Sequence, residues 1–404
     1  MKGNDVRGSA IDLDRLRADT PGTAKVAHLN NAGSALPPDQ VVDAVVAFLR
    51  REAEVGGYEA KTEASDALEA VYDSVARLIN VGRDEIAFIE NATQAWDMAF
   101  YAIDFRPGDR ILTAQAEYAS NAIAYLQRAR SHGVIVEVVP DGPDGALSVD
   151  ALRDMIDDRV RLIAVTHVPT QNGLVNPAAE IGAVARAAGI LYLLDACQSV
   201  GQLPIDVAEI GCHLLSATGR KFLRGPRGTG FLYVDRTIMD QLEPPFLDLH
   251  AAEWTAPDRY VMRDDARRFE TWETAYAGRI GLGVAVDYAL DIGLPAIAMR
   301  NAMLADRLRR GLSQVPGVTV HDRGSQKSAI TTFTAEGVGA DHVQARLSAA
   351  AINVSVTGAS SAQYDLPRHG LEAVVRASPH YYNSEAEVDL LVTAMEDIRK
   401  DAVV

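Results

Sequence analysis

Between residues 85 and 195, short apolar segments alternate with segments in which apolar residues recur at helical spacing. Five apolar segments are each long enough for one buried strand, at residues 85–89, 110–113, 134–139, 161–167 and 190–194. Helical patterns separate them, at residues 93–103, 121–132, 149–157 and 179–188. Strands that alternate with helices are joined by crossovers, which give a mostly parallel sheet. The pattern therefore predicts an α/β domain that binds ligands at the carboxyl ends of its strands.

The pattern changes after residue 285, which indicates a second and smaller unit. A helix is expected over residues 285–314, and further helices near 341–350 and 385–402. Short apolar segments lie near residues 318–321, 329–333, 352–356 and 374–378. We expect an N-terminal arm (1–27), a large α/β domain (28–285) and a smaller α+β domain (286–404).

Composition and charge exclude several classes of function. The chain has 404 residues and a net charge of −16, which argues against binding to nucleic acid or to an anionic membrane surface. No segment reaches the roughly 20 apolar residues that a membrane span needs, and the N-terminus does not resemble a secretory signal. With only two cysteines there is no disulfide framework. We expect a cytoplasmic protein with no metal site and no nucleic-acid or membrane partner.

The segment from residue 191 to residue 234 carries the chemistry. Asp195 ends a buried apolar segment, and Lys221 lies in a polar turn before the next one, at residues 230–234. Either residue alone is as readily a helix cap or a solvated charge. Together they are what pyridoxal phosphate (PLP) requires. The lysine forms a Schiff base with the cofactor aldehyde, and the carboxylate keeps the pyridine nitrogen protonated.

With the intervening LPID and the following GPRGTGFLY, these two residues resemble the cofactor segment of the class V aminotransferase family. That family includes cysteine desulfurases, selenocysteine lyases, isopenicillin-N-epimerase-like enzymes and cysteine-conjugate C–S lyases. The resemblance implies a PLP-dependent enzyme of fold type I. It also implies a homodimer with both active sites at the subunit interface, and a small amino acid as substrate.

The resemblance further implies which residues hold the phosphate. In the family, the turn that matches Asn-Ala-Thr-Gln cradles this group, which implies contacts from Ala92 and Thr93. Thr218 and Arg220 precede Lys221 where desulfurases commonly have Ser-Gly-His-Lys. A hydroxyl and a guanidinium can both bind phosphate, so we expect both to do so.

Other cofactor contacts follow from the same resemblance. Gln198 matches a glutamine that contacts the phenolic oxygen, and Tyr118 stands where desulfurases have a histidine stacked on the ring. A tyrosine can stack equally well, and its hydroxyl could also donate a proton during catalysis. Thr170 replaces the asparagine of the family's His-Val-Ser-Asn, which leaves its contact with the ring hydroxyl or the substrate open. Glu273 and Thr274 match the segment that approaches the partner subunit's phosphate.

Four residues are implied on the substrate side. Arg376, in VVRASPHYYN, matches the arginine that clamps the α-carboxylate of the amino acid. A guanidinium fork suits a carboxylate by geometry, and the bound carboxylate orients Cα. Asn31, Gly33 and Tyr58 lie in segments that resemble substrate-side loops.

One difference from desulfurases concerns the reaction. Their nucleophilic cysteine lies on a loop before the carboxylate-binding arginine, and here Ser361 falls in its place. Cys197 and Cys212 lie in the core pattern of the large domain, and Cys197 is expected to be a small buried filler. A persulfide mechanism is therefore disfavoured. We expect catalysis by Lys221, Asp195 and Tyr118.

Several reactions remain open for this set of residues. The segments EAEVGGYEA and EYASN most resemble cysteine-conjugate lyases of ergothioneine-type and related natural-product pathways. This favours β-elimination, with C–S cleavage, from an S-substituted L-cysteine. The alternatives are decarboxylation-dependent oxidative deamination of such a conjugate, epimerisation and transamination.

Overall fold

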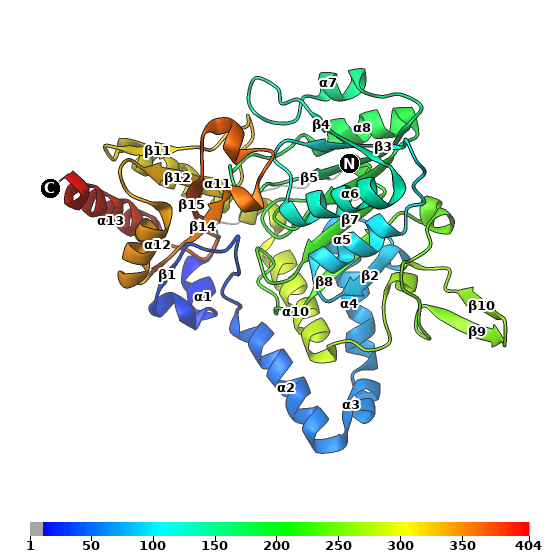
Figure 1. Cartoon of the computed structure of the whole chain (residues 1–404). Coiled ribbons are helices and arrows are strands. Elements are labelled where there is room, and N and C mark those ends of the chain that lie inside the picture. Colours follow the sequence, from blue (N-terminus) through cyan, green and yellow to red (C-terminus); the bar gives the residue numbers. More distant parts are fainter. Residues whose placement is uncertain (1–10, 404) are drawn as a thin grey trace, which may run out of the picture.

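The computed structural model describes residues 11–403, and its largest element is a seven-stranded sheet (Figure 1). The strands are β2 (Ile86–Ile89), β3 (Arg110–Ala114), β4 (Ile135–Val139), β5 (Val160–Thr166), β6 (Leu191–Asp195), β7 (Leu214–Thr218) and β8 (Gly230–Val234). Their order is β2-β8-β7-β6-β5-β3-β4, and only β8 runs antiparallel to its neighbours. The predicted mostly parallel sheet of fold type I is confirmed.

Helices cover both faces of this sheet, which explains why its strands are largely apolar. Neighbouring strand residues face opposite layers. Leu193 packs in one core with α5 (Ala92–Tyr101) and α6 (Ala119–His132). Leu194 packs in the other core, to which the following helices contribute: α4 (Ser65–Ile79), α7 (Val149–Asp154), α8 (Ala178–Ala188), α9 (Val207–Ile210) and α10 (Tyr276–Ile292). The carboxyl ends of the central strands remain open between these layers.

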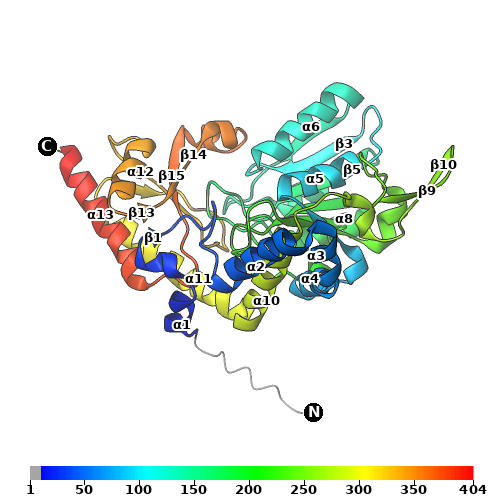
Figure 2. The same cartoon turned by 90° about the horizontal axis from the view of Figure 1, so that it is seen from below.

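A second sheet lies beside the first in the C-terminal part of the chain (Figure 2). It is antiparallel, with strand order β11-β12-β15-β14. Its strands are β11 (Val318–Val320), β12 (Thr331–Ala335), β14 (Ser355–Gly358) and β15 (Ala373–Ala377). The accompanying helices are α11 (Leu294–Gln314), α12 (Ala340–Ala349) and α13 (Glu385–Val403). Separate strands and helices of this kind make the expected α+β unit.

The N-terminal segment packs against this second unit. Strand β1 (Ala27–His28) pairs in parallel with β13 (Ile352–Asn353), and Leu29 lies in the same apolar core as β12 and β15. The domain boundaries at residues 28 and 286 stay a prediction. The first ten residues of the expected arm lie outside the described residues.

The remaining elements are helices α1 (Leu13–Ala18), α2 (Asp39–Val55) and α3 (Gly57–Glu63), and the hairpin of β9 (Ala252–Ala256) and β10 (Arg259–Met262). Both views show this hairpin projecting away from the sheet (Figures 1 and 2). Short 3-10 helices are η1 (Pro21–Ala24), η2 (Arg83–Glu85), η3 (Arg236–Gln241), η4 (Ala266–Phe269), η5 (Ala359–Ser361) and η6 (Leu366–His369).

The single helix expected over residues 285–314 is wrong. The structure has two helices there, α10 and α11, which meet at Gly293 with a bend of 80°. Gly293 has φ 91°, a conformation that glycine adopts without strain, and Pro295 follows in the first turn of α11. Among residues 11–403, no single helix is both long and apolar enough to cross a membrane, although this bent pair meets that requirement together.

Candidate active site

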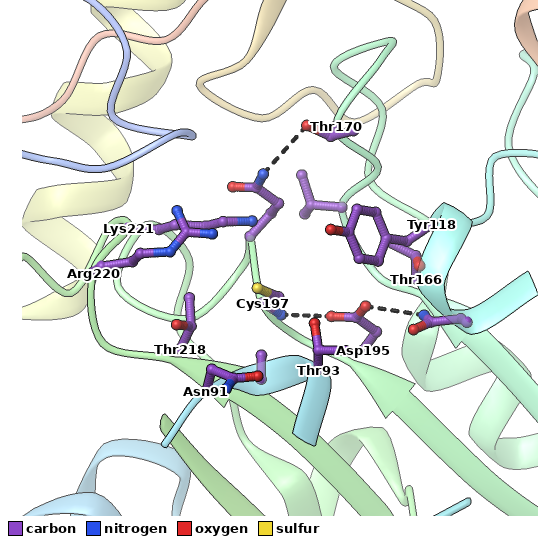
Figure 3. A pocket seen from close by; sticks show the side chains of 14 residues that line it. Asn91, Thr93, Tyr118, Thr166, Thr170, Asp195, Cys197, Thr218, Arg220 and Lys221 are labelled. Carbon is purple, nitrogen blue, oxygen red and sulfur yellow. Dashed lines mark hydrogen bonds between the residues drawn. The ribbon is translucent and has the colours of Figure 1, made fainter. Parts of the chain in front are cut away.

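A pocket opens at the carboxyl ends of β5, β6 and β7, next to the N-terminus of α5 (Figure 3). Nine residues predicted from the sequence line it: Ala92, Thr93, Tyr118, Thr170, Asp195, Gln198, Thr218, Arg220 and Lys221. They come from five separate stretches of the chain. The pocket is where parallel sheets bind ligands, because strand ends and helix N-termini meet there.

Asp195 forms the floor of this pocket (Figure 3). Its side chain is 5% exposed, and it accepts hydrogen bonds from the backbone N–H of Cys197 (2.9 Å) and from Nδ2 of Asn121 (3.0 Å). Burial raises the pKa of this carboxyl, while the two hydrogen bonds and the charge of Lys221 lower it. A buried carboxylate with mainly neutral partners still attracts a cation, and a protonated pyridine nitrogen is one.

Lys221 lies in the turn after β7, and its amine lines the same pocket (Figure 3). Burial lowers the pKa of this ammonium, and the nearby charges of Arg220 and Arg376 lower it further. A larger fraction of neutral amine is what attack on an aldehyde needs. The lysine is therefore suited to hold a carbonyl cofactor.

The N-terminus of α5 supplies an anion site. The side chain of Asn91 caps the helix by accepting from the backbone N–H of Gln94 (2.9 Å), and the first-turn residues Ala92 and Thr93 line the pocket. Free backbone N–H groups and the helix dipole favour a phosphate at such a place. The turn packs tightly on β8: a Cβ on Gly230 would lie 2.7 Å from the carbonyl oxygen of Ala217 and 3.0 Å from the carbonyl carbon of Asn91.

Two side chains of the β7 turn complete the anion site. Thr218 donates from its hydroxyl to the backbone oxygen of Thr229 (3.2 Å), and its side chain borders the pocket. Arg220 donates to the carbonyl oxygen of Gly33, a neutral partner. Within the described part of the chain, no carboxylate forms an ion pair with Arg220. Its charge is thus available to an anion in the pocket.

Gln198 and Thr170 lie on the opposite wall. Nε2 of Gln198 donates to the backbone oxygen of Ala32 (3.1 Å) and to Oγ1 of Thr170 (3.4 Å). Its Oε1 is buried and has no partner among the described residues. Oγ1 of Thr170 also accepts from the guanidinium of Arg376. These contacts connect the pocket wall to a buried arginine.

Arg376 lies on β15 and is 8% exposed. Besides Thr170, it donates to Oδ1 of Asn30 (3.3 Å), and its Nε has no partner among the described residues. Burial and the charge of Arg220 lower the pKa of this guanidinium to about 10, so it stays charged at neutral pH. Buried charges are normally paired. This one is available for the carboxylate of a ligand.

These residues fit PLP. A buried carboxylate suits the pyridine nitrogen, a lysine of lowered pKa suits the aldehyde, and a helix N-terminus with a nearby arginine suits the phosphate. When bound, PLP would supply the electron-withdrawing ring that activates Cα of an amino acid. The pocket agrees with the expected cofactor.

Two of the predicted substrate residues lie next to the pocket without lining it. Asn31 is fully buried, and both ends of its amide are used. Nδ2 donates to the backbone oxygen of Ser378 (2.8 Å), and Oδ1 accepts from the hydroxyl of Tyr382 (2.5 Å). Asn31 therefore holds its loop in place, and Gly33 offers only its carbonyl oxygen, to Arg220.

Three other predicted residues lie away from Lys221 within this chain. Tyr58, on α3, is 71% exposed. It borders a separate hollow together with Thr274 and Trp272. Glu273 is exposed beside them. Their expected contacts with a cofactor stay a prediction that depends on a second subunit.

Sequence reasoning missed Asn121, Thr166 and Val168, which also line the pocket. Asn121 lies in the quoted EYASN segment, one helical turn after Glu117, and that spacing was the available signal. Cys197, expected to be a filler, is part of the pocket wall. Thr166 and Val168 flank His167 in the sequence, and no sequence signal distinguishes these two residues from core residues.

The structure also shows where Ser361 and the two cysteines lie relative to the pocket. Ser361 lies at the end of η5 and is half-buried, and it does not line the pocket. Cys212 is buried, and burial raises the pKa of its thiol to about 12. Burial also raises the pKa of Cys197. Neither thiol is activated as a nucleophile in this state.

A model of the family described as aminotransferase class-V matches residues 27–391. The chain belongs to the class V aminotransferase family. It is 31% identical to a probable cysteine desulfurase of Methanothermobacter thermautotrophicus, over 95% of this chain and 97% of that protein. It is also 31% identical to a cysteine desulfurase of Pectobacterium atrosepticum, over 96% of this chain and 98% of that protein.

Solved structures agree with this assignment. The apo structure of a cysteine desulfurase from Thermococcus onnurineus has a TM-score of 0.91 and 27% identity, and covers 98% of this chain and 100% of that chain. The cystine C–S lyase C-DES has a TM-score of 0.85 at 23% identity, covers 94% of this chain and 99% of that chain, and shows the shared fold. The chain is therefore a PLP-dependent enzyme of this family.

These relatives correct the expected reaction. β-Elimination from an S-substituted cysteine is favoured by the sequence over desulfuration because Ser361 replaces the nucleophilic cysteine and because two segments resemble cysteine-conjugate lyases, and this prediction is wrong. Relatives that match along almost the whole chain are named cysteine desulfurases. The physical reason is that Ser361 lies at the end of η5 and does not line the pocket that holds Lys221 and Asp195, so it is no guide to the chemistry of that pocket.

Proposed function

We propose that this protein is a PLP-dependent desulfurase that removes the sulfur of L-cysteine and releases L-alanine. The observation that carries the proposal is Arg376, a buried guanidinium without a carboxylate partner at the edge of the pocket that holds Lys221. It suits the α-carboxylate of a small amino acid. Relatives named cysteine desulfurases align with almost the full length of this chain, and this supports L-cysteine as that amino acid.

Each residue has a role in this proposal. Arg376 binds the α-carboxylate and so directs Cα toward Lys221, whose amine takes the Cα proton and returns a proton to the product. Asp195 would keep the pyridine nitrogen of PLP protonated, and Tyr118, which lines the pocket, would stack on the cofactor ring and could donate a proton from its hydroxyl.

The sulfur acceptor is a thiol supplied from outside the chain. Ser361 has no thiol, and neither cysteine is activated. The reaction is L-cysteine + R–SH → L-alanine + R–S–SH. The Cβ–S bond breaks, an S–S bond forms, and Cβ takes up a proton. Carbon is reduced as sulfur is oxidised, so no other electron acceptor is needed.

A homodimer is part of the proposal. Tyr58 and Thr274 border one exposed hollow that contains no cofactor lysine, and Glu273 is exposed beside it. Trp272 borders the same hollow and is 40% exposed, and Phe246 and Trp254 are also exposed (72% and 78%). Such exposure favours a covered interface. In a dimer formed through this surface, the hollow would face the phosphate of the cofactor bound in the other subunit.

The test is a product analysis with L-cysteine. The holoprotein is incubated with L-cysteine, with and without dithiothreitol as the thiol, and alanine, pyruvate and sulfide are measured. With dithiothreitol we expect alanine and sulfide in equal amounts, because its second thiol attacks the inner sulfur of the persulfide, closes the cyclic disulfide and releases sulfide. Without dithiothreitol, L-cysteine is the only thiol present, and we expect slower alanine formation and less sulfide than alanine. Pyruvate and ammonia in place of alanine would contradict the proposal.

A matched pair of variants locates the acceptor. Cys197→Ala should keep alanine formation within about twofold, because the acceptor is external. Lys221→Ala should abolish it. Loss of alanine formation in Cys197→Ala, with the cofactor still bound, would mean that this thiol is the acceptor and that the external route is wrong.

A further inference from the structure

A second carboxylate is buried close to Asp195. Glu117 lies between β3 and α6, and its side chain is 3% exposed. Its carboxylate accepts five hydrogen bonds, from the backbone N–H of Tyr118 (2.7 Å), Nδ2 of Asn121 (3.0 Å) and the hydroxyls of Thr113 (2.6 Å), Tyr125 (3.2 Å) and Thr166. Every one of these donors is neutral. A buried carboxylate without a cation is costly, so its presence calls for a function.

Asn121 connects this carboxylate to the floor of the pocket. Its Nδ2 donates both to Oε1 of Glu117 (3.0 Å) and to Oδ2 of Asp195 (3.0 Å). The amide nitrogen has two N–H bonds, and both are used. Because an ionised Glu117 only accepts hydrogen bonds, its Oε1 must face the NH2 end of the Asn121 amide. This orientation also directs Nδ2 of Asn121 toward Asp195. A reversed amide would bring oxygen against oxygen at both carboxylates.

The hydrogen bonds favour the ionised form of Glu117. The backbone N–H of Tyr118 and the amide of Asn121 cannot accept, so Oε1 cannot carry a proton without losing both bonds. The hydroxyls could reverse: those of Thr113 and Tyr125 at Oε2, and that of Thr166 at Oε1. Burial and the charge of Asp195 oppose ionisation and raise the pKa of Glu117. The titratable groups that face Glu117 are Asp195, Tyr125 and Tyr364.

We propose that Glu117 is a positioning residue for the cofactor: through Asn121 it fixes Asp195 as a hydrogen-bond acceptor and adds a second negative charge beneath the pyridine nitrogen. The proposal rests on the contact between Asp195 and that nitrogen, which is part of the proposed function. Asp195 already accepts from Cys197 and Asn121, and an amide locked as a donor leaves the remaining lone pairs of Asp195 for the cofactor N–H. The second charge favours the protonated nitrogen.

A purely structural role is the alternative. Glu117 ties together β3 through Thr113, β5 through Thr166 and α6 through Asn121. Loss of such a network would lower stability without any specific effect on the cofactor. The test must therefore separate the charge of Glu117 from its hydrogen bonds.

Glu117→Gln and Thr113→Val form the matched pair. The first removes the charge and keeps the shape, and the second removes one hydrogen bond to Glu117 and keeps the charge. The measurements are the dissociation constant of PLP from the apoprotein, the pH titration of the visible absorbance of the bound cofactor, and the melting temperature. None of them requires turnover of L-cysteine, so failure of the proposed desulfurase reaction would not affect them.

We expect Glu117→Gln to weaken PLP binding about tenfold or more and to move the absorbance titration to lower pH by about one unit, because a negative charge that favours the protonated cofactor is lost. Thr113→Val should lower the melting temperature and leave the titration unchanged. Equal effects of the two variants on PLP binding and titration would overturn the proposal, as would wild-type values in Glu117→Gln.

Asn121→Ala tests the connection and keeps the proposal testable should Glu117→Gln fail to fold. It leaves four hydrogen bonds to Glu117 in place. We expect weakening of PLP binding similar to that of Glu117→Gln, and a double variant no weaker than the more affected single one, because both changes act on the same contact. Additive losses would show that Glu117 and Asn121 act independently.

Discussion

Replacement of Arg376 by lysine tests the amino-acid site most directly. The guanidinium is 8% exposed, and it is held by Thr170 and by Oδ1 of Asn30 (3.3 Å). Its planar fork can give two parallel hydrogen bonds to a carboxylate, whereas an ammonium is a single compact charge. Arg376→Lys therefore keeps the charge and removes at least one charged hydrogen bond to the bound amino acid.

The size of the effect follows from that bond. A hydrogen bond to a charged group contributes about 1.5–3 kcal/mol, and 1.4 kcal/mol is about tenfold in affinity. We expect the affinity for L-alanine, the proposed product, to fall about 10- to 150-fold. The cofactor absorbance of the holoprotein during titration with L-alanine measures this, and the KM for L-cysteine should rise by a similar factor.

The control is Arg300→Lys, because Arg300 also lies largely buried (13% exposed side chain) but pairs with Glu385 on α13, outside the pocket. It should leave the affinity for L-alanine unchanged. An affinity of Arg376→Lys within twofold of wild type would refute the assignment of Arg376 to the α-carboxylate.

Three further predictions concern the cofactor and the fold. Lys221→Ala should lack the visible band of lysine-bound PLP and should not retain PLP after borohydride reduction; retained label would mean that another lysine holds the cofactor. Gly230→Ala should weaken PLP binding and lower stability by about 1–3 kcal/mol, because its Cβ would lie 2.7 Å from the oxygen of Ala217; unchanged PLP affinity and melting temperature would contradict the tight turn at the phosphate site. Burial lowers the pKa of His167 to about 4, against about 6.5 in the unfolded chain, so the unfolded state binds the proton first and stability is lost as the pH falls from about 6.5 to about 4. The shift corresponds to about 3 kcal/mol, so His167→Gln should reduce the loss of urea stability of the apoprotein between pH 7 and pH 4.5; an unchanged loss would contradict it.

Much of the fold could be read from the sequence because its signals are local. Apolar periodicity located the strands from Ile89 to Asp195 and the helices between them, but it missed α9 and β7, which precede Lys221. The break at Gly293 was missed, since apolar spacing continues through it and only the φ of 91° and the packing of the two helices reveal the turn. The projecting hairpin of β9 and β10 has mostly exposed residues, so it left no strong burial pattern.

The reaction was the part that sequence reasoning judged wrongly. Ser361 alone led to the rejection of desulfuration, although a sulfur acceptor need not belong to the chain. The residues proposed to bind the amino acid and PLP are distributed over both sheets, from α5 to β15. The similarity of this chain to named desulfurases extends over nearly its whole length.

The sequence by itself determined the cofactor and the fold class. A strand-end carboxylate at Asp195 and a lysine at Lys221 lie in short segments whose form depends on neighbouring residues. The tertiary structure alone decided which distant groups meet. Packing brings Arg376 to Thr170, and it aligns Glu117, Asn121 and Asp195 in one buried network. The direction of these hydrogen bonds and the burial of the charged side chains are set only when separate elements pack together. No local sequence pattern predicts them.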